Sequence, residues 1–364
     1  WRRVMVIGLL FLAAGVSVPL SEHVFPARYP AMTKAQLAGQ ILASPALEAN
    51  GVDVAGLRAF LASENSVILY GRGLYPRYYT SGQGELGNLS RWRVAGKPYT
   101  VSEYNHPAPN DFQAEMMPLL STFASFQDWD GFYTFDYGKS RAGQPNNSIQ
   151  GFFDCGTNPA KVAFYPSTSL IFRKGLIPAA TRQAILEVAK KPWAHGLSSG
   201  ELWDRSGKMP FLLSGRTAVQ KGASDTWSVK LRGEPQASSP LKVQRNPEGV
   251  VYIADAPAAK AVTGRVGGRT VACSGASFVF PKFGENFASL TLVALDARPL
   301  AQTKRALFTL VGRVENQNMG WNETRTSVSD QWGNGPTLAE FVPVTVQLAN
   351  EAVRKVFALD GNGR

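Results

Sequence analysis

The spacing of apolar positions changes after residues 99–102, which have the composition of a strand. Over residues 112–126 apolar side chains recur every three or four positions, and this spacing predicts a helix with one apolar face. Pro118 lies inside this stretch, so we expect the helix to consist of two pieces or to restart there. A second strand is predicted over residues 132–137. Strand, helix and strand within about forty residues indicate a βαβ unit with parallel strands.

A second helix is predicted over residues 158–174, because Asn158 can cap its start and Gly175 can end it. Residues 191–240 are rich in Gly and Ser, and we interpret them as a connector. Short strands separated by turn signals follow and suit a β-sandwich. They are predicted at residues 250–254, 261–266, 270–273, 289–295, 306–314, 341–347 and 353–359. The polar stretch 315–323 is either a sugar-binding loop or an ordinary hairpin connection.

The amino-terminal segment carries an apolar run, Val4 to Leu20, directly after Arg2 and Arg3. The run is about long enough to span a bilayer, and the positive residues before it favour an inward amino terminus with the rest outside. It predicts a hydrophobic helix that is an anchor, a signal sequence or a piece of a larger membrane protein. A buried helix of a soluble protein is the alternative. No chemistry attaches to the mixed region 24–90.

Composition adds limits to this picture. The chain has 364 residues, of which 44% are hydrophobic, so it can build a core and two or three domains. Its net charge is +11, but the 38 Lys and Arg residues are scattered, and we therefore expect no nucleic-acid partner. Cys155 and Cys273 form no CxxC motif or His/Cys cluster, so no metal site is expected, while a single disulfide between them stays open. The 8 Trp, 11 Tyr and 20 Phe residues suit sugar stacking as well as a core.

Glu103 is the candidate for chemistry. It lies just past the carboxyl end of the first predicted strand, where the active sites of (β/α)8 barrels are built. Tyr104, Asn105 and His106 follow it and could hydrogen-bond sugar hydroxyls or hold the carboxylate. Retaining glycosidases need one carboxylate that attacks the anomeric carbon and a second that protonates the leaving oxygen, and Glu103 suits the first role. A solvated loop glutamate is the alternative.

Two segments carry a family resemblance. SEYNHPAPNDFQAEMMPLLSTFASFQDWDGFYTFDY and NPAKVAFYPSTSLIFRKG resemble the end of the barrel in bacterial clan A glycoside hydrolases, the cellulase and β-galactosidase superfamily. The resemblance covers residues 91–190 well and the later chain more loosely. It implies the last two strands and helices of a (β/α)8 barrel, with Glu103 as nucleophile and Trp129, Asp136 and Tyr137 near the sugar. It further implies a carbohydrate substrate, no cofactor and a place in the bacterial periplasm or at the cell surface.

One part of the superfamily pattern is missing. The superfamily takes its acid/base from an Asn-Glu pair upstream of the nucleophile, whereas the pairs here, Asn322-Glu323 and Asn350-Glu351, both lie downstream. A whole barrel takes about 250 residues, and only about 75 precede the first predicted strand. We therefore expect an incomplete barrel. A fragment, a degenerate non-catalytic relative and a barrel completed by a partner chain are the open explanations.

The sequence thus predicts an α/β plus all-β chain: an incomplete (β/α)8 barrel followed by a β-sandwich, with an N-terminal hydrophobic helix. The expected parts are residues 1–23 (hydrophobic helix), 24–90 (mixed region), 91–190 (barrel portion), 191–240 (connector) and 241–364 (β-sandwich). The expected function is a retaining glycoside hydrolase for β-linked poly- or oligosaccharides that lacks its acid/base in this chain. A non-catalytic, membrane-tethered carbohydrate-binding protein is the alternative, and a membrane protein defined by its amino-terminal part is a third.

Overall fold

The computed structural model describes most of the chain from residue 85 onward. The described residues are 85–137, 147–189, 202–203, 213–226, 228–233, 238–246, 249–323, 325, 327–350, 353 and 355–359. Of the described residues, those from 85 to 315 and from 335 to 359 belong to one compact unit, and those from 316 to 334 belong to another. The apolar run of residues 4–20 lies outside the described part, so its anchor or signal role stays a prediction. Within the described part, no helix is long and apolar enough to cross a membrane.

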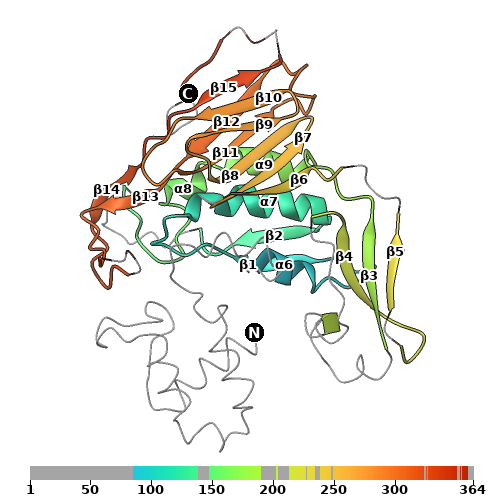
Figure 1. Cartoon of the computed structure of the whole chain (residues 1–364). Helices are drawn as coiled ribbons and strands as arrows, with labels where there is room; N and C mark the ends of the chain where they lie inside the picture. The colour runs from blue at the N-terminus through green and yellow to red at the C-terminus, as the bar shows by residue number, and fades with distance from the viewer. Residues whose placement is uncertain are drawn as a thin grey trace, which may run out of the picture. The chain divides into compact units, whose positions relative to one another are not determined.

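The predicted βαβ unit is confirmed (Figure 1). Strand β1 (Thr100–Tyr104) pairs in parallel with β2 (Gly131–Thr134), and helix α7 (Met116–Gln127) connects them. The helical stretch has two pieces, as expected, but the 3-10 turn η2 (Gln113–Glu115) gives way to α7 at Met116 and not at Pro118. Pro118 lies in the first turn of α7, where the missing N–H would have no partner inside the helix.

The second predicted helix is also confirmed, as two short helices. These are α8 (Pro159–Val162) and α9 (Tyr165–Arg173). The side chain of Asn158 accepts a hydrogen bond from the backbone N–H of Ala160 at 3.1 Å, which makes it the N-cap. Gly175 follows α9 with φ +60°, a conformation that glycine adopts without strain.

The expected connector contains two strands that the sequence pattern did not predict. β3 (Gln183–Val188) pairs in parallel with β4 (Arg216–Lys221) and antiparallel with β5 (Ser228–Arg232). β4 is also hydrogen-bonded to the segment just before β1, since the N–H of Val219 donates to the carbonyl of Arg93 at 2.8 Å. Strands β4 and β5 are short and partly polar, so their composition gave no local strand pattern. They are held in place by pairing with residues distant in the sequence.

The carboxyl-terminal half is rich in sheet, as expected. One antiparallel sheet has the order β12 (Ala306–Val311), β11 (Phe287–Ala294), β8 (Ala259–Arg265), β7 (Gly249–Ala256) and β6 (Leu241–Asn246). A second has the order β15 (Thr345–Leu348), β10 (Ala276–Phe280) and β9 (Arg269–Cys273), and β13 (Val314–Gln317) pairs with β14 (Asn334–Ala339). β3, β6, β10 and β14 were not predicted, and the strand expected at residues 353–359 is wrong for the residues described there.

The five-stranded sheet is covered on both faces. Every residue of β11 is buried. On one face α7 packs against β8 and α9 against β11. Two hydroxyl contacts join these layers, Thr122 to Tyr252 at 2.9 Å and Thr291 to Ser167 at 2.8 Å. On the other face the ring of Phe278 from β10 stacks on the ring of Phe308 from β12, with 6.3 Å between the ring centroids. The five-stranded sheet is therefore packed directly on α7 and α9.

Candidate functional site

The register of the β1–β2 pair slips by one residue just before the carboxyl end of β1. Val101 pairs with Phe132, and Tyr104 pairs with Thr134. Two residues of β1 therefore lie opposite one residue of β2. Such bulges re-aim side chains and occur next to active sites. In a regular strand Glu103 would share the buried side of Val101, whereas here Glu103 is exposed.

The contacts of β2 identify which face of the pair is open. The ring of Phe132 packs on the ring of Phe172 from α9, with 4.7 Å between the ring centroids. The Thr134 hydroxyl lies 3.1 Å from the hydroxyl of Tyr165, also on α9. These β2 residues thus point toward the helix. Since in-register neighbours of a parallel pair point the same way, the residues between the two paired positions point to the other face. Glu103 lies on this open face, at the carboxyl end of β1.

Aromatic side chains line the end of β2 beside Glu103. Tyr133, Phe135 and Tyr137 are 65%, 40% and 66% exposed, and we call them the aromatic stripe. Large apolar side chains exposed together are a common feature of ligand sites. Tyr137 was expected near the sugar, whereas Tyr133 and Phe135 were not. Only Tyr133 belongs to β2 itself; after the strand, the ring of Phe135 packs on Phe153 and the ring of Tyr137 stacks on Tyr165 of α9.

Asn105 comes directly after β1, and its side-chain amide is engaged by the protein. Its Nδ2 donates to the carbonyl of Phe135 and, at 2.5 Å, to the carbonyl of Phe153. Its Oδ1 accepts a hydrogen bond from Lys161 at 2.6 Å. Both amide hydrogens are therefore used inside the chain. Asn105 joins the ends of the two strands, which differs from the substrate contact that the sequence predicted for it.

Lys161 belongs to α8 and is fully buried, at 0% exposure. Its Nζ donates to Asn105 and, at 3.4 Å, to the carbonyl of Asp154. Burial lowers the pKa of Lys161 to about 8, while the negative forms of Cys155, Asp154 and Asp136 act in the opposite direction. Its position in a short amphipathic helix carried no sequence signal, so it was missed.

His106 forms a chain of contacts with the buried residues Tyr104 and Glu115. Its Nε2 lies 3.0 Å from the Tyr104 hydroxyl, and its Nδ1 lies 3.4 Å from Oε1 of Glu115. Burial, aided by the charge of Lys161, lowers the pKa of His106 to about 3, and burial raises the pKa of Glu115 well above its usual value. Both groups thus favour their neutral forms.

This neutral histidine predicts an acid-sensitive stability. Below pH 6.5 the unfolded chain binds a proton at His106 that the folded chain does not bind until about pH 3. The contribution of His106 to stability therefore falls as the pH drops through this window, while the raised pKa of Glu115 acts in the opposite direction. Between pH 7 and pH 5 we expect His106→Asn to remove roughly 2 kcal/mol of this loss. Urea unfolding at both pH values measures it, and equal losses in the variant and the natural chain would contradict the prediction.

Trp129 lies at the opposite end of β2 from Glu103. It is 5% exposed, and its ring packs edge-on against Tyr99 at 5.4 Å and Phe123 at 5.7 Å. The structure therefore does not bring Trp129 to the aromatic stripe.

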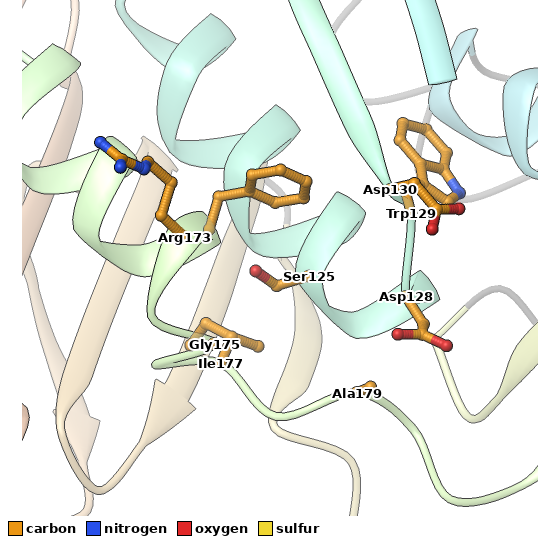
Figure 2. A pocket seen from close by; sticks show the side chains of 9 residues that line it. Ser125, Asp128, Trp129, Asp130, Arg173, Gly175, Ile177 and Ala179 are labelled. Carbon is orange, nitrogen blue, oxygen red and sulfur yellow. The ribbon is translucent and has the colours of Figure 1, made fainter. Parts of the chain in front are cut away.

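Trp129 borders a pocket of about 410 Å³, shown in Figure 2. The other lining residues are Ser125, Asp128, Asp130, Phe172, Arg173, Gly175, Ile177 and Ala179.

Asp136 lies between the aromatic residues and is half-buried. Its backbone N–H donates to Phe153 at 3.1 Å, and its carbonyl accepts from Cys155 at 2.9 Å. The segment around Phe153 thus closes over the end of β2.

The thiols of Cys155 and Cys273 are both free, so the disulfide left open by the sequence is not formed. Burial raises the pKa of each thiol, to about 11 for Cys273.

The comparisons with known proteins add no family. In searches of protein-family models, curated proteins and solved structures, no match to this chain was found.

Proposed function

We propose that the carboxyl end of the β1–β2 pair is the nucleophile half of a retaining β-glycosidase site. In this proposal β1, α7, β2 and α8–α9 are the last two strand–helix units of a (β/α)8 barrel. The observation that carries it is the register slip in β1, which places Glu103 on the open face opposite Tyr133 of the aromatic stripe. Active sites of barrels lie at the carboxyl ends of their strands.

The combination of groups favours a sugar over other ligands. A pyranose ring has apolar faces that stack on aromatic rings and polar edges that hydrogen-bond. Tyr133 and Phe135 provide exposed rings on β2 and directly after it, and Glu103 provides an exposed carboxylate on the neighbouring strand. Glu115 is buried and favours its protonated form, so it does not suit the nucleophile's role.

The reaction follows from the carboxylate. An oxygen of Glu103 attacks the anomeric carbon, and a bond forms between them as the bond to the leaving oxygen breaks. The leaving oxygen takes the electron pair and is ordinarily protonated by a second carboxyl group. Water then hydrolyses the glycosyl ester and restores Glu103 with overall retention of configuration.

A substrate that needs no protonation isolates the step assigned to Glu103. A 2,4-dinitrophenolate is stable as an anion, so it leaves a dinitrophenyl β-glycoside without a general acid. We expect the full chain to release a burst of about one dinitrophenolate per chain with at least one sugar of a β-glycoside panel, followed by slower turnover.

Two outcomes decide the proposal. A burst whose size scales with the protein concentration supports it, because this is the kinetic sign of a covalent intermediate. Absence of a burst across the panel overturns it. If the chain then still binds an insoluble β-linked polysaccharide and Tyr133→Ala weakens that binding, the carbohydrate-binding alternative replaces the hydrolase.

A further inference from the structure

We propose that Lys161 and Asn105 are positioning residues for Glu103. This inference rests on the proposed function. Together they form a buried ammonium–amide contact, which we call the staple, between α8 and the end of β1. The staple fixes the carboxyl end of β1, and hence Glu103, relative to the aromatic stripe.

Lys161 sets the orientation of the Asn105 amide. An ammonium group only donates hydrogen bonds, so it requires the amide oxygen on its side. The NH2 group then faces the carbonyls of Phe135 and Phe153, where it donates to both. A flipped amide would bring its oxygen against those carbonyls and its NH2 group against Lys161. The buried charge thus selects the single orientation that ties the strand ends together.

Two hydrogen bonds from the end of β1 hold the backbone N–H and the backbone carbonyl of Phe135, a residue of the aromatic stripe. The N–H of Phe135 donates to the carbonyl of Tyr104 at 3.0 Å, and its carbonyl accepts from the Asn105 side chain. Tyr104 and Asn105 directly follow Glu103 in the chain. A shift of the staple therefore changes the distance between the Glu103 carboxylate and the ring of Phe135. A misplacement of about 1 Å can cost about 100-fold in rate.

The charge on the staple is pH-dependent within an accessible range. The titratable groups that act on Lys161 or are acted on by it are Cys155, Asp154, Asp136 and His106. Burial outweighs the acidic groups among them and lowers the pKa of Lys161 to about 8. Above this pH the neutral amine no longer requires the amide oxygen, since it can accept as well as donate. The staple should therefore loosen as the pH rises through 8.

The kinetic test uses two variants and a matched control in the dinitrophenyl β-glycoside assay. Lys161→Met removes the charge with a side chain of similar length. Asn105→Asp keeps an acceptor for Lys161 but loses both donors. We expect each to lower the burst rate constant about 100-fold, with little change in the half-saturating concentration. Lys174→Met, at the exposed end of α9, should behave like the natural chain.

The pH profile separates positioning from general stability. The natural chain should lose burst rate above about pH 8, and Lys161→Met should lack this alkaline limb. Near-natural burst rates in both variants, or an alkaline limb that persists in Lys161→Met, would overturn the role of the staple.

A second readout needs no activity. Amide hydrogen exchange at Phe135 reports the hydrogen bond to Tyr104, and Val293 in β11 serves as the internal reference. In the natural chain we expect the protection of Phe135, relative to Val293, to fall about tenfold as the pH passes 8. Unchanged relative protection in the natural chain overturns the staple even if a variant fails to fold. Lost protection without any burst would sink the hydrolase proposal and leave the staple standing.

Discussion

Replacement of Glu103 with glutamine is expected to lower dinitrophenolate release roughly 10⁴- to 10⁶-fold, which is the scale for removing the nucleophile of a covalent enzyme. Glutamine keeps the size of the side chain but cannot form the glycosyl ester. Glu103 is exposed, so the change should leave the fold and sugar binding intact. Burst kinetics measure the rate, and equilibrium binding of the released sugar measures the affinity.

The chain offers a matched control for this variant. Glu323 is also exposed and belongs to Asn322-Glu323, one of the two Asn-Glu pairs of the sequence. It lies in the segment that connects the paired strands β13 and β14. Glu323→Gln should leave the burst unchanged. A natural burst in Glu103→Gln, or its loss in Glu323→Gln, would contradict the assignment.

The second large effect concerns stability. Asp255 and Lys260 form a buried ion pair at 2.6 Å in the five-stranded sheet. Burial alone would raise the pKa of Asp255, but hydrogen bonds from Lys260 and Ser274 outweigh it and lower the pKa. Asp255→Ala leaves the Lys260 charge buried without its partner. We expect a loss of about 3–5 kcal/mol in the free energy of unfolding, measured by urea denaturation.

Two controls show whether the unpaired charge is the cause. The double variant Asp255→Ala with Lys260→Met removes both charges and should regain much of the lost stability. Lys230→Met breaks an ion pair with Glu187 in which the lysine is 56% exposed, and it should leave the urea midpoint nearly unchanged. A loss in the double variant as large as in the single one would refute this account.

The elements with strong local signals could be predicted from the sequence. Apolar spacing gave α7, and the cap at Asn158 with Gly175 gave the bounds of α8–α9. The position of Glu103 at a strand end followed from the same pattern, because a strand that meets proline and asparagine has to stop. These features depend only on residues near one another in the chain.

What the sequence could not supply depends on contacts between distant residues. The register slip that exposes Glu103 is defined by pairing with β2, about thirty residues later, and no local rule fixes it. Asn105 is engaged by Lys161, 56 positions away, so its internal role was invisible. Trp129 looked like a sugar platform, but its neighbours Tyr99 and Phe123 bury it.

The central claim is that Glu103 forms a covalent bond to a sugar, and trapping that bond tests it most directly. Dinitrophenyl 2-deoxy-2-fluoro-β-glycosides react with a nucleophile and then hydrolyse slowly, because fluorine destabilises the oxocarbenium-like transition state. The full chain is treated with each sugar, digested with protease and analysed by mass spectrometry. We predict a single peptide heavier by one fluorosugar, with the modification on Glu103. No labelled peptide with any sugar, or a label on another residue, would contradict the account.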